Sequence, residues 1–214
     1  SATLFDIIVF SADAGTKNKG AVIYFHGNRE NINRYAPFAK NFTKHGYTVY
    51  MMDYPGYGKS TGVITEKILY EEAGQVYKLA SADGYSADSI IIYGKSIGTG
   101  IAAYLASKEK CKMLILETPY YSLQKIAEHY FWMYPIDYMT NYDIPAYEYI
   151  GKTAEPVIIF HGTDDGTIPY HQAKKLWKET NKPGDEFITI EGGEHNNLND
   201  YPLMQQKLDS LLRK

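Results

Sequence analysis

Cysteine is almost absent from this chain of 214 residues. The single cysteine, Cys111, excludes a disulfide within the chain, so the fold must be stabilised by a packed core. Apolar residues make up 44% of the sequence and charged residues 22%, which is ordinary for a globular protein. A chain of this length buries about 70% of the surface that it exposes when unfolded. We therefore expect a single domain over residues 1–214.

Long hydrophobic runs are also missing. No stretch approaches the roughly 18 consecutive apolar residues of a membrane-spanning helix, and no signal peptide is visible. These absences favour a soluble, cytoplasmic protein, and no membrane association is evident. The chain opens on a predicted strand, however, which leaves open that a leader or anchor has been removed from its N-terminus.

Neither sign of charge dominates. The formal net charge is −3 and there is no long basic run, so nucleic acid is not an expected partner. No cluster of His, Cys and acidic residues has metal-site spacing, and we predict no metal and no cofactor. Gly58–Ser60 and Gly94–Ser96 resemble the end of a phosphate-binding loop, but both lack the earlier glycine which that motif requires. The expected partner is a small-molecule or acyl substrate.

What the sequence does contain is a regular alternation of short apolar runs and helical patterns. The apolar runs are continuous, which is typical of strands buried on both faces. Their alternation with helices predicts an α/β fold with a mostly parallel sheet of about seven strands. Expected strands cover 5–10, 21–25, 47–52, 90–93, 113–116, 157–160 and 187–190, and expected helices cover 33–45, 65–82, 101–106, 170–180 and 203–212. Ligands of such sheets bind beyond the carboxyl ends of the strands.

One segment, residues 120–152, interrupts this alternation. It is rich in tyrosine and other aromatic residues, contains Pro135 and Pro145, and is too long for a simple crossover helix. We expect it to form a small helical cap over the strand ends. The alternative is a crossover whose aromatic side chains only pack on the sheet.

The pattern Gly-x-Ser-x-Gly occurs at Gly94–Gly98, between a predicted strand and a predicted helix. In this context the pattern is typical of a nucleophile elbow, where a strained turn exposes the serine above the sheet. The two glycines remove side chains that the turn would crowd. Ser96 is therefore the candidate nucleophile, and the alternative is an ordinary glycine-rich loop.

A serine hydroxyl needs a base within hydrogen-bond reach, and the base needs an acid that orients it. His195 follows the last predicted strand and is the candidate base, whereas His26 and His161 each precede a glycine and are expected to fix their own loops. The candidate acid is Asp164 or Asp165.

Two further positions complete this interpretation. Glu117 also ends a predicted strand and could serve as the acid by position, but we expect it to have a structural role. Acyl transfer also needs donors for the developing oxyanion. The expected donors are the backbone N–H of Ile97, which follows the nucleophile, and that of Asn28, in the loop after strand 21–25.

Five motifs in order resemble the α/β-hydrolase superfamily, and within it small serine hydrolases whose oxyanion stretch reads His-Gly-Asn. The motifs are residues 24–28, 53–60, 94–98, 161–169 and 193–196. The resemblance covers essentially the whole chain and implies an α/β-hydrolase fold. The fourth motif matches the family pattern His-Gly-x-x-Asp-x-x-(Val/Ile)-Pro, which implies that Asp165 is the acid of a triad with Ser96 and His195. About 25 residues precede His26, fewer than in similar proteins, which implies a reduced sheet edge or a trimmed chain.

The predicted function is a serine hydrolase that cleaves carboxylic esters or thioesters through an acyl-enzyme, without a cofactor. The aromatic segment favours an apolar acyl or aryl group, and its short length favours an open site. One alternative is a peptidase or amidase with the same triad. The other is a catalytically silent binding protein on this fold.

Overall fold

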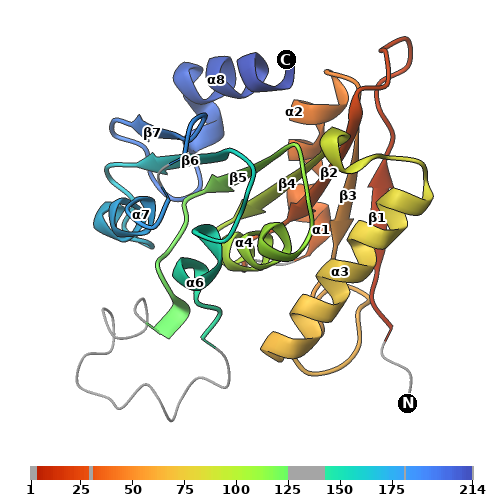
Figure 1. The fold of residues 1–214 in the computed structure, drawn as a ribbon, viewed down its shortest axis with the longest axis horizontal. Helices are drawn as coiled ribbons and strands as arrows, with labels where there is room; N and C mark the ends of the chain where they lie inside the picture. Colours follow the sequence, from red (N-terminus) through yellow and green to blue (C-terminus); the bar gives the residue numbers. More distant parts are fainter. Residues whose placement is uncertain (1–3, 29–30, 125–142, 181, 214) are drawn as a thin grey trace.

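A computed structural model describes residues 4–28, 31–124, 143–180 and 182–213, and its centre is a seven-stranded sheet (Figure 1). The strand order is β1-β3-β2-β4-β5-β6-β7. All neighbouring strands are parallel except β1, which pairs antiparallel with β3 at one edge. The strands are β1 (Ile7–Phe10), β2 (Gly20–Phe25), β3 (Tyr47–Met52), β4 (Ile90–Lys95), β5 (Met113–Glu117), β6 (Val157–Gly162) and β7 (Glu186–Ile190). The predicted mostly parallel sheet is confirmed.

Helices cover both faces of this sheet. One face packs against α3 (Glu66–Ala82), α4 (Gly98–Lys108), α6 (Ala146–Ile150) and α7 (Tyr170–Trp177). The opposite face packs against α1 (Ile32–Tyr35), α2 (Lys40–Thr43) and α8 (Pro202–Arg213). Strand β2 illustrates why the apolar runs of the strands are continuous. Its side chains point alternately to the two faces, with Ile23 in one core and Val22 in the other, and both are fully buried.

The single helix expected over residues 33–45 is wrong as one element. The segment forms α1, then a 3₁₀ turn (Ala36–Ala39), then α2. The turn contains Pro37. Proline has no backbone N–H to donate to the preceding turn of a helix, and its ring clashes with the carbonyl of that turn. The apolar spacing thus marks a helical segment, but the proline divides it into separate turns.

The expected cap, residues 120–152, lies mostly outside the described residues, because residues 125–142 are not among them. Of the remainder, α6 packs against α4, and the rings of Tyr121 and Tyr147 stack with centroids 4.5 Å apart. The cap, and the single-domain organisation of residues 1–214, therefore stay predictions. Among the described helices, none is long and apolar enough to cross a membrane.

Candidate active site

The turn between β4 and α4 holds Ser96 in a backbone conformation that residues other than glycine rarely adopt. The φ angle of Ser96 is +53°, in the left-handed region. Hydrogen bonds hold the turn on both sides of the hydroxyl: the Ser96 N–H donates to the Glu117 carbonyl at 2.9 Å, and the Ser96 carbonyl accepts from the Thr99 N–H at 2.9 Å. This geometry is the one expected of a nucleophile elbow, in which backbone strain presents the serine above the sheet.

Close backbone contacts explain the two glycines of the elbow. A Cβ atom on Gly94 would lie less than 3.0 Å from the Gly98 carbonyl oxygen. A Cβ atom on Gly98 would lie equally close to the carbonyl oxygens of Phe25 and His26. Real Cβ atoms essentially never approach so closely, so only glycine lets the start of α4 lie against the end of β2.

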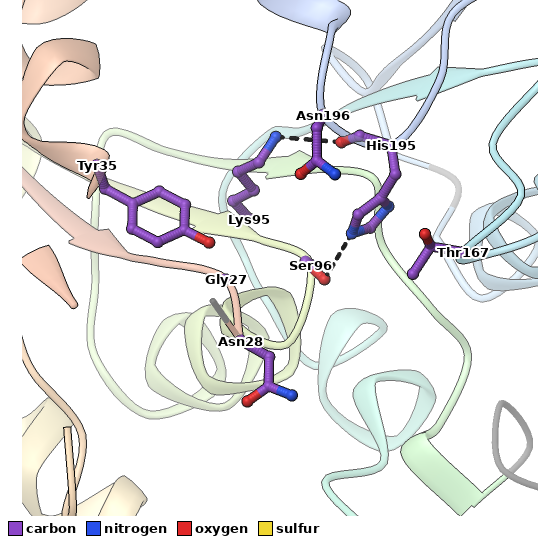
Figure 2. Close-up of a pocket in the computed structure, with 8 residues that line it drawn as sticks. All are labelled: Gly27, Asn28, Tyr35, Lys95, Ser96, Thr167, His195 and Asn196. Atoms are coloured by element: carbon purple, nitrogen blue, oxygen red, sulfur yellow. Dashed lines mark hydrogen bonds between the residues drawn. The ribbon is translucent and has the colours of Figure 1, made fainter. Parts of the chain in front are cut away.

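His195 reaches Ser96 from one other loop, and Asp165 reaches His195 from another. The Nε2 atom of His195, in the loop after β7, lies 2.9 Å from Ser96 Oγ (Figure 2). Its Nδ1 atom lies 2.8 Å from Oδ2 of Asp165, in the loop after β6. The structure thus brings together the three side chains that the sequence analysis named as a triad. Asp164 is exposed, and its carboxylate accepts from the Thr163 hydroxyl at 3.0 Å.

The surroundings of Asp165 favour its ionised form. Burial alone would raise the pKa of Asp165, but the hydrogen bond and charge of His195 and the hydrogen bond from the Ile168 N–H outweigh burial and lower it. Its Oδ1 atom accepts from the N–H groups of Thr167, at 2.8 Å, and Ile168, at 2.7 Å. A carboxylate in this state can hold the His195 ring and stabilise its positive charge when it takes a proton.

The buried ring of His161 fixes the loop that carries Asp165, as the sequence predicted. Its Nε2 atom lies 2.9 Å from the Ile168 carbonyl oxygen, to which it donates, and 3.4 Å from Asp165 Oδ2. Burial lowers the pKa of His161 from its usual 6.5, against the opposing effects of Ile168 and Asp165. His161 is therefore a neutral structural residue and not a second base.

The loop after β2 lies beside the elbow. A Cβ atom on Gly27 would be 3.4 Å from Ser96 Cβ, and the buried Tyr54 hydroxyl donates to the His26 carbonyl at 2.7 Å. Among the described residues, no acceptor is found for the backbone N–H groups of Asn28 and Ile97. Both amides are thus available near Ser96, although their role as oxyanion donors stays a prediction.

A cavity of about 270 Å³ opens at Ser96, and most of the described residues that line it have side chains with a polar group (Figure 2). The lining residues are Gly27, Asn28, Tyr35, Lys95, Ser96, Thr167, His195 and Asn196. None of these described residues carries a carboxylate. The expected preference for an apolar acyl group rested on the aromatic segment, most of which lies outside the described residues, so it stays a prediction.

Sequence reasoning assigned no role to several of these lining residues. Tyr35 has no predicted role beyond its place in the helix expected over residues 33–45, and Lys95 has none beyond its place in the motif of residues 94–98. Thr167 and Asn196 fall within two of the family motifs but received no role. The one available signal was that Lys95 directly precedes the candidate nucleophile.

Glu117 does not contact the His195 ring as a triad acid would. Its side chain is fully buried and binds Lys95, Tyr93 and Asn199. Within the described part of the chain, no group of three or more His, Cys, Asp or Glu side chains is arranged to hold a metal ion.

Comparisons with known proteins agree with this architecture. The sequence pattern of the family described as "Serine aminopeptidase, S33" matches residues 16–139, which is more than half of the chain. Curated relatives include alpha/beta hydrolase domain-containing protein 17C from Xenopus tropicalis, 29% identical over 195 residues that cover 89% of this chain and 61% of the relative. The human protein 17B is 29% identical, with 89% of this chain and 65% of the relative covered. This chain thus spans about three fifths of the length of these relatives.

Solved structures share the fold at low sequence identity. An esterase from Exiguobacterium antarcticum superposes with a TM-score of 0.73 at 16% identity, covering 99% of this chain and 96% of that one. An alpha-beta serine hydrolase homologue from Coxiella burnetii gives 0.72 at 20% identity, covering 98% and 90%. These likenesses confirm the α/β-hydrolase fold.

Proposed function

We propose that this chain, which belongs to the serine aminopeptidase S33 family of α/β-hydrolases, cleaves carboxylic esters or thioesters through an acyl-enzyme. The observation that carries the proposal is the continuous hydrogen-bonded path from Ser96 through His195 to Asp165, at 2.9 and 2.8 Å. These are the distances at which a base can take the proton of a nucleophile while an acid orients the base.

In the proposed reaction Ser96 Oγ attacks the acyl carbon as His195 Nε2 accepts its proton. Asp165 holds Nδ1 of the ring and stabilises the imidazolium that forms. The backbone N–H groups of Asn28 and Ile97 donate to the oxyanion of the tetrahedral intermediate. His195 then returns the proton to the departing alcohol or thiol. Water attacks the acyl-enzyme in the same manner and releases the acid and the free serine.

An ester or thioester is favoured over an N-terminal peptide by the charges in the cavity. An aminopeptidase has to bind the positively charged α-amino group of its substrate, for which a carboxylate is the natural partner. The described residues that line the cavity include no Asp or Glu, and the one lysine or arginine among them is Lys95. A cationic group therefore gains little in this part of the cavity.

A substrate panel tests the proposal. We would measure kcat/KM for p-nitrophenyl esters of increasing chain length, for a thioester, and for aminoacyl-amides. The expected result is hydrolysis of esters and thioesters with weak or no hydrolysis of the amides. Cleavage of the amides without cleavage of esters would contradict the proposal and favour the peptidase alternative. The chain-length series would also report the acyl preference.

A further inference from the structure

Lys95, the residue before the candidate nucleophile, contacts the loop that carries the candidate base. Lys95 ends β4 and is peptide-bonded to Ser96, and its side chain is almost fully buried. Its Nζ atom donates to the backbone carbonyl oxygen of His195 at 3.3 Å (Figure 2). Lys95 therefore links the elbow directly to the loop that carries the candidate base.

A buried carboxylate on the neighbouring strand holds this lysine. Glu117 is the register partner of Lys95 across the β4–β5 pair, and the two side chains form an ion pair. The Glu117 carboxylate also accepts from Asn199 Nδ2 at 3.2 Å. Asn199 itself is bound by the Asn41 amide at 2.8 Å.

These contacts hold the loop of the candidate base at two points, His195 itself and Asn199. Lys95 binds the loop at residue 195, and Glu117 binds the chain again at Asn199, a little further along. Both anchors belong to β4 and β5, which also hold Ser96, because the Glu117 carbonyl accepts the Ser96 N–H. One buried pair thus sets the position of the loop relative to the nucleophile.

The buried ion pair between Lys95 and Glu117 is costly for folding. Burying two charges carries a desolvation penalty, and well-packed apolar residues of similar volume are often at least as stable. An apolar pair could not bind the His195 carbonyl. The ion pair therefore gives the site a contact, from Lys95 to the His195 carbonyl oxygen, that apolar packing would not supply.

We propose that Lys95 and Glu117 are positioning residues that hold His195 at hydrogen-bonding distance from Ser96. The inference rests on the proposed function, in which His195 is the base for Ser96. Lys95 acts through the backbone of His195, so for an uncharged ester the pair changes the rate of the chemical step and not the binding of substrate.

The variant that tests this is the double substitution Lys95→Met/Glu117→Gln. Either single substitution would leave a buried charge without its partner and endanger folding. The double variant removes both charges, keeps similar volumes, and leaves an amide oxygen at position 117 that can still accept from Asn199. The matched control is Tyr50→Phe, which removes a hydrogen bond to the carboxylate of Asp83, just after α3. Neither residue of this control pair is among the described residues that line the cavity.

The thermal midpoint of each protein shows whether it is folded. Activity is then measured as kcat and KM for an ester and as the rate of labelling by a fluorophosphonate probe. In the folded double variant we expect kcat and the labelling rate to fall about 10–100-fold, the scale of a displaced catalytic group, with KM little changed. Tyr50→Phe should lose stability while its kcat stays close to wild type.

A further measurement does not depend on activity. Proton NMR follows the proton shared by His195 Nδ1 and Asp165, whose exchange with solvent should be faster in the double variant than in wild type or Tyr50→Phe. Unchanged kcat and exchange in a folded double variant would overturn the proposal, as would a rise in KM with kcat unchanged. If wild-type protein were inactive, the proposed function would fail, and the exchange measurement would still decide whether the pair positions His195.

Discussion

Asp164 and Asp165 are adjacent in the chain, yet their carboxylates face opposite surroundings. Asp165 is buried with Oδ2 on the His195 ring, whereas Asp164 is exposed and binds the Thr163 hydroxyl. The pair therefore offers a test with its own control, because the same substitution at neighbouring positions should have very different effects.

Asp165→Asn should lower kcat/KM for an ester by about 10³–10⁴-fold, since an amide cannot hold His195 in the required tautomer or stabilise its charge. The measurement is steady-state hydrolysis of a p-nitrophenyl ester. Asp164→Asn should behave like wild type. Equal losses in the two variants, or a loss confined to Asp164→Asn, would show that the acid has been assigned wrongly.

Gly98→Ala should disrupt the elbow. The added Cβ would lie less than 3.0 Å from the carbonyl oxygens of Phe25 and His26, so the start of α4 must move away from β2. We expect a loss of roughly 1–3 kcal/mol in the free energy of unfolding, together with a loss of ester hydrolysis. Chemical denaturation and the ester assay measure the two effects.

The control for this substitution is Gly74→Ala, within helix α3, where a Cβ meets no atom within 4 Å. There the same change should stabilise the protein by about 0.4–1 kcal/mol, because alanine has fewer unfolded conformations and favours a helix. A stable, active Gly98→Ala variant would contradict the close approach of α4 to β2.

Glu72→Gln should stabilise the protein at alkaline pH. Glu72 lies buried in α3, neither of its oxygens has a hydrogen-bond partner among the described residues, and burial raises the pKa of its carboxyl from 4.5 to about 7. Between these two values the folded protein holds a proton that the unfolded chain has released, so this group lowers stability as pH rises.

Thermal unfolding at a series of pH values measures this effect. We expect Glu72→Gln to melt close to wild type near pH 4.5 and several degrees higher at pH 8, since 1 kcal/mol corresponds to about 2–4 °C in a domain of this size. The control is Glu71→Gln, at an exposed position whose ion pair with Lys67 contributes little. A pH-independent difference between wild type and Glu72→Gln would refute the buried, protonated carboxyl.

His161 should make the opposite contribution to stability. Because burial lowers the pKa of its imidazole in the folded protein, the unfolded chain takes up a proton first as pH falls below 6.5. Its contribution is therefore complete above pH 6.5 and is lost below it. An NMR titration should show the His161 ring of the folded protein still neutral just below pH 6.5, where the ring in the unfolded chain has begun to take up its proton. Protonation of the folded ring at that pH would contradict its burial.

The sequence predicted the sheet well because its strands are buried on both faces and hence read as continuous apolar runs, as β2 illustrates. It also predicted which residues follow the strand ends, where Ser96, Asp165 and His195 meet. The break at Pro37 follows from the chemistry of proline. The apolar residues on both sides of it have the spacing of one continuous helix, and that spacing favoured a single element.

The Lys95–Glu117 pair could not have been predicted in the same way. Each residue is a single charge at the end of an apolar run, and only the register of β4 against β5 makes them partners. Register depends on long-range packing and not on the local sequence. The contact from Lys95 to His195 depends further on a loop that comes much later in the chain.

Covalent labelling tests most directly whether Ser96 is an activated nucleophile. Folded wild-type protein and Ser96→Ala would be treated with a fluorophosphonate probe and examined by intact mass and peptide mapping. We expect one adduct per wild-type molecule, on Ser96, and none in Ser96→Ala. Folded wild-type protein that stays unlabelled, or an adduct that persists in Ser96→Ala, would contradict this expectation.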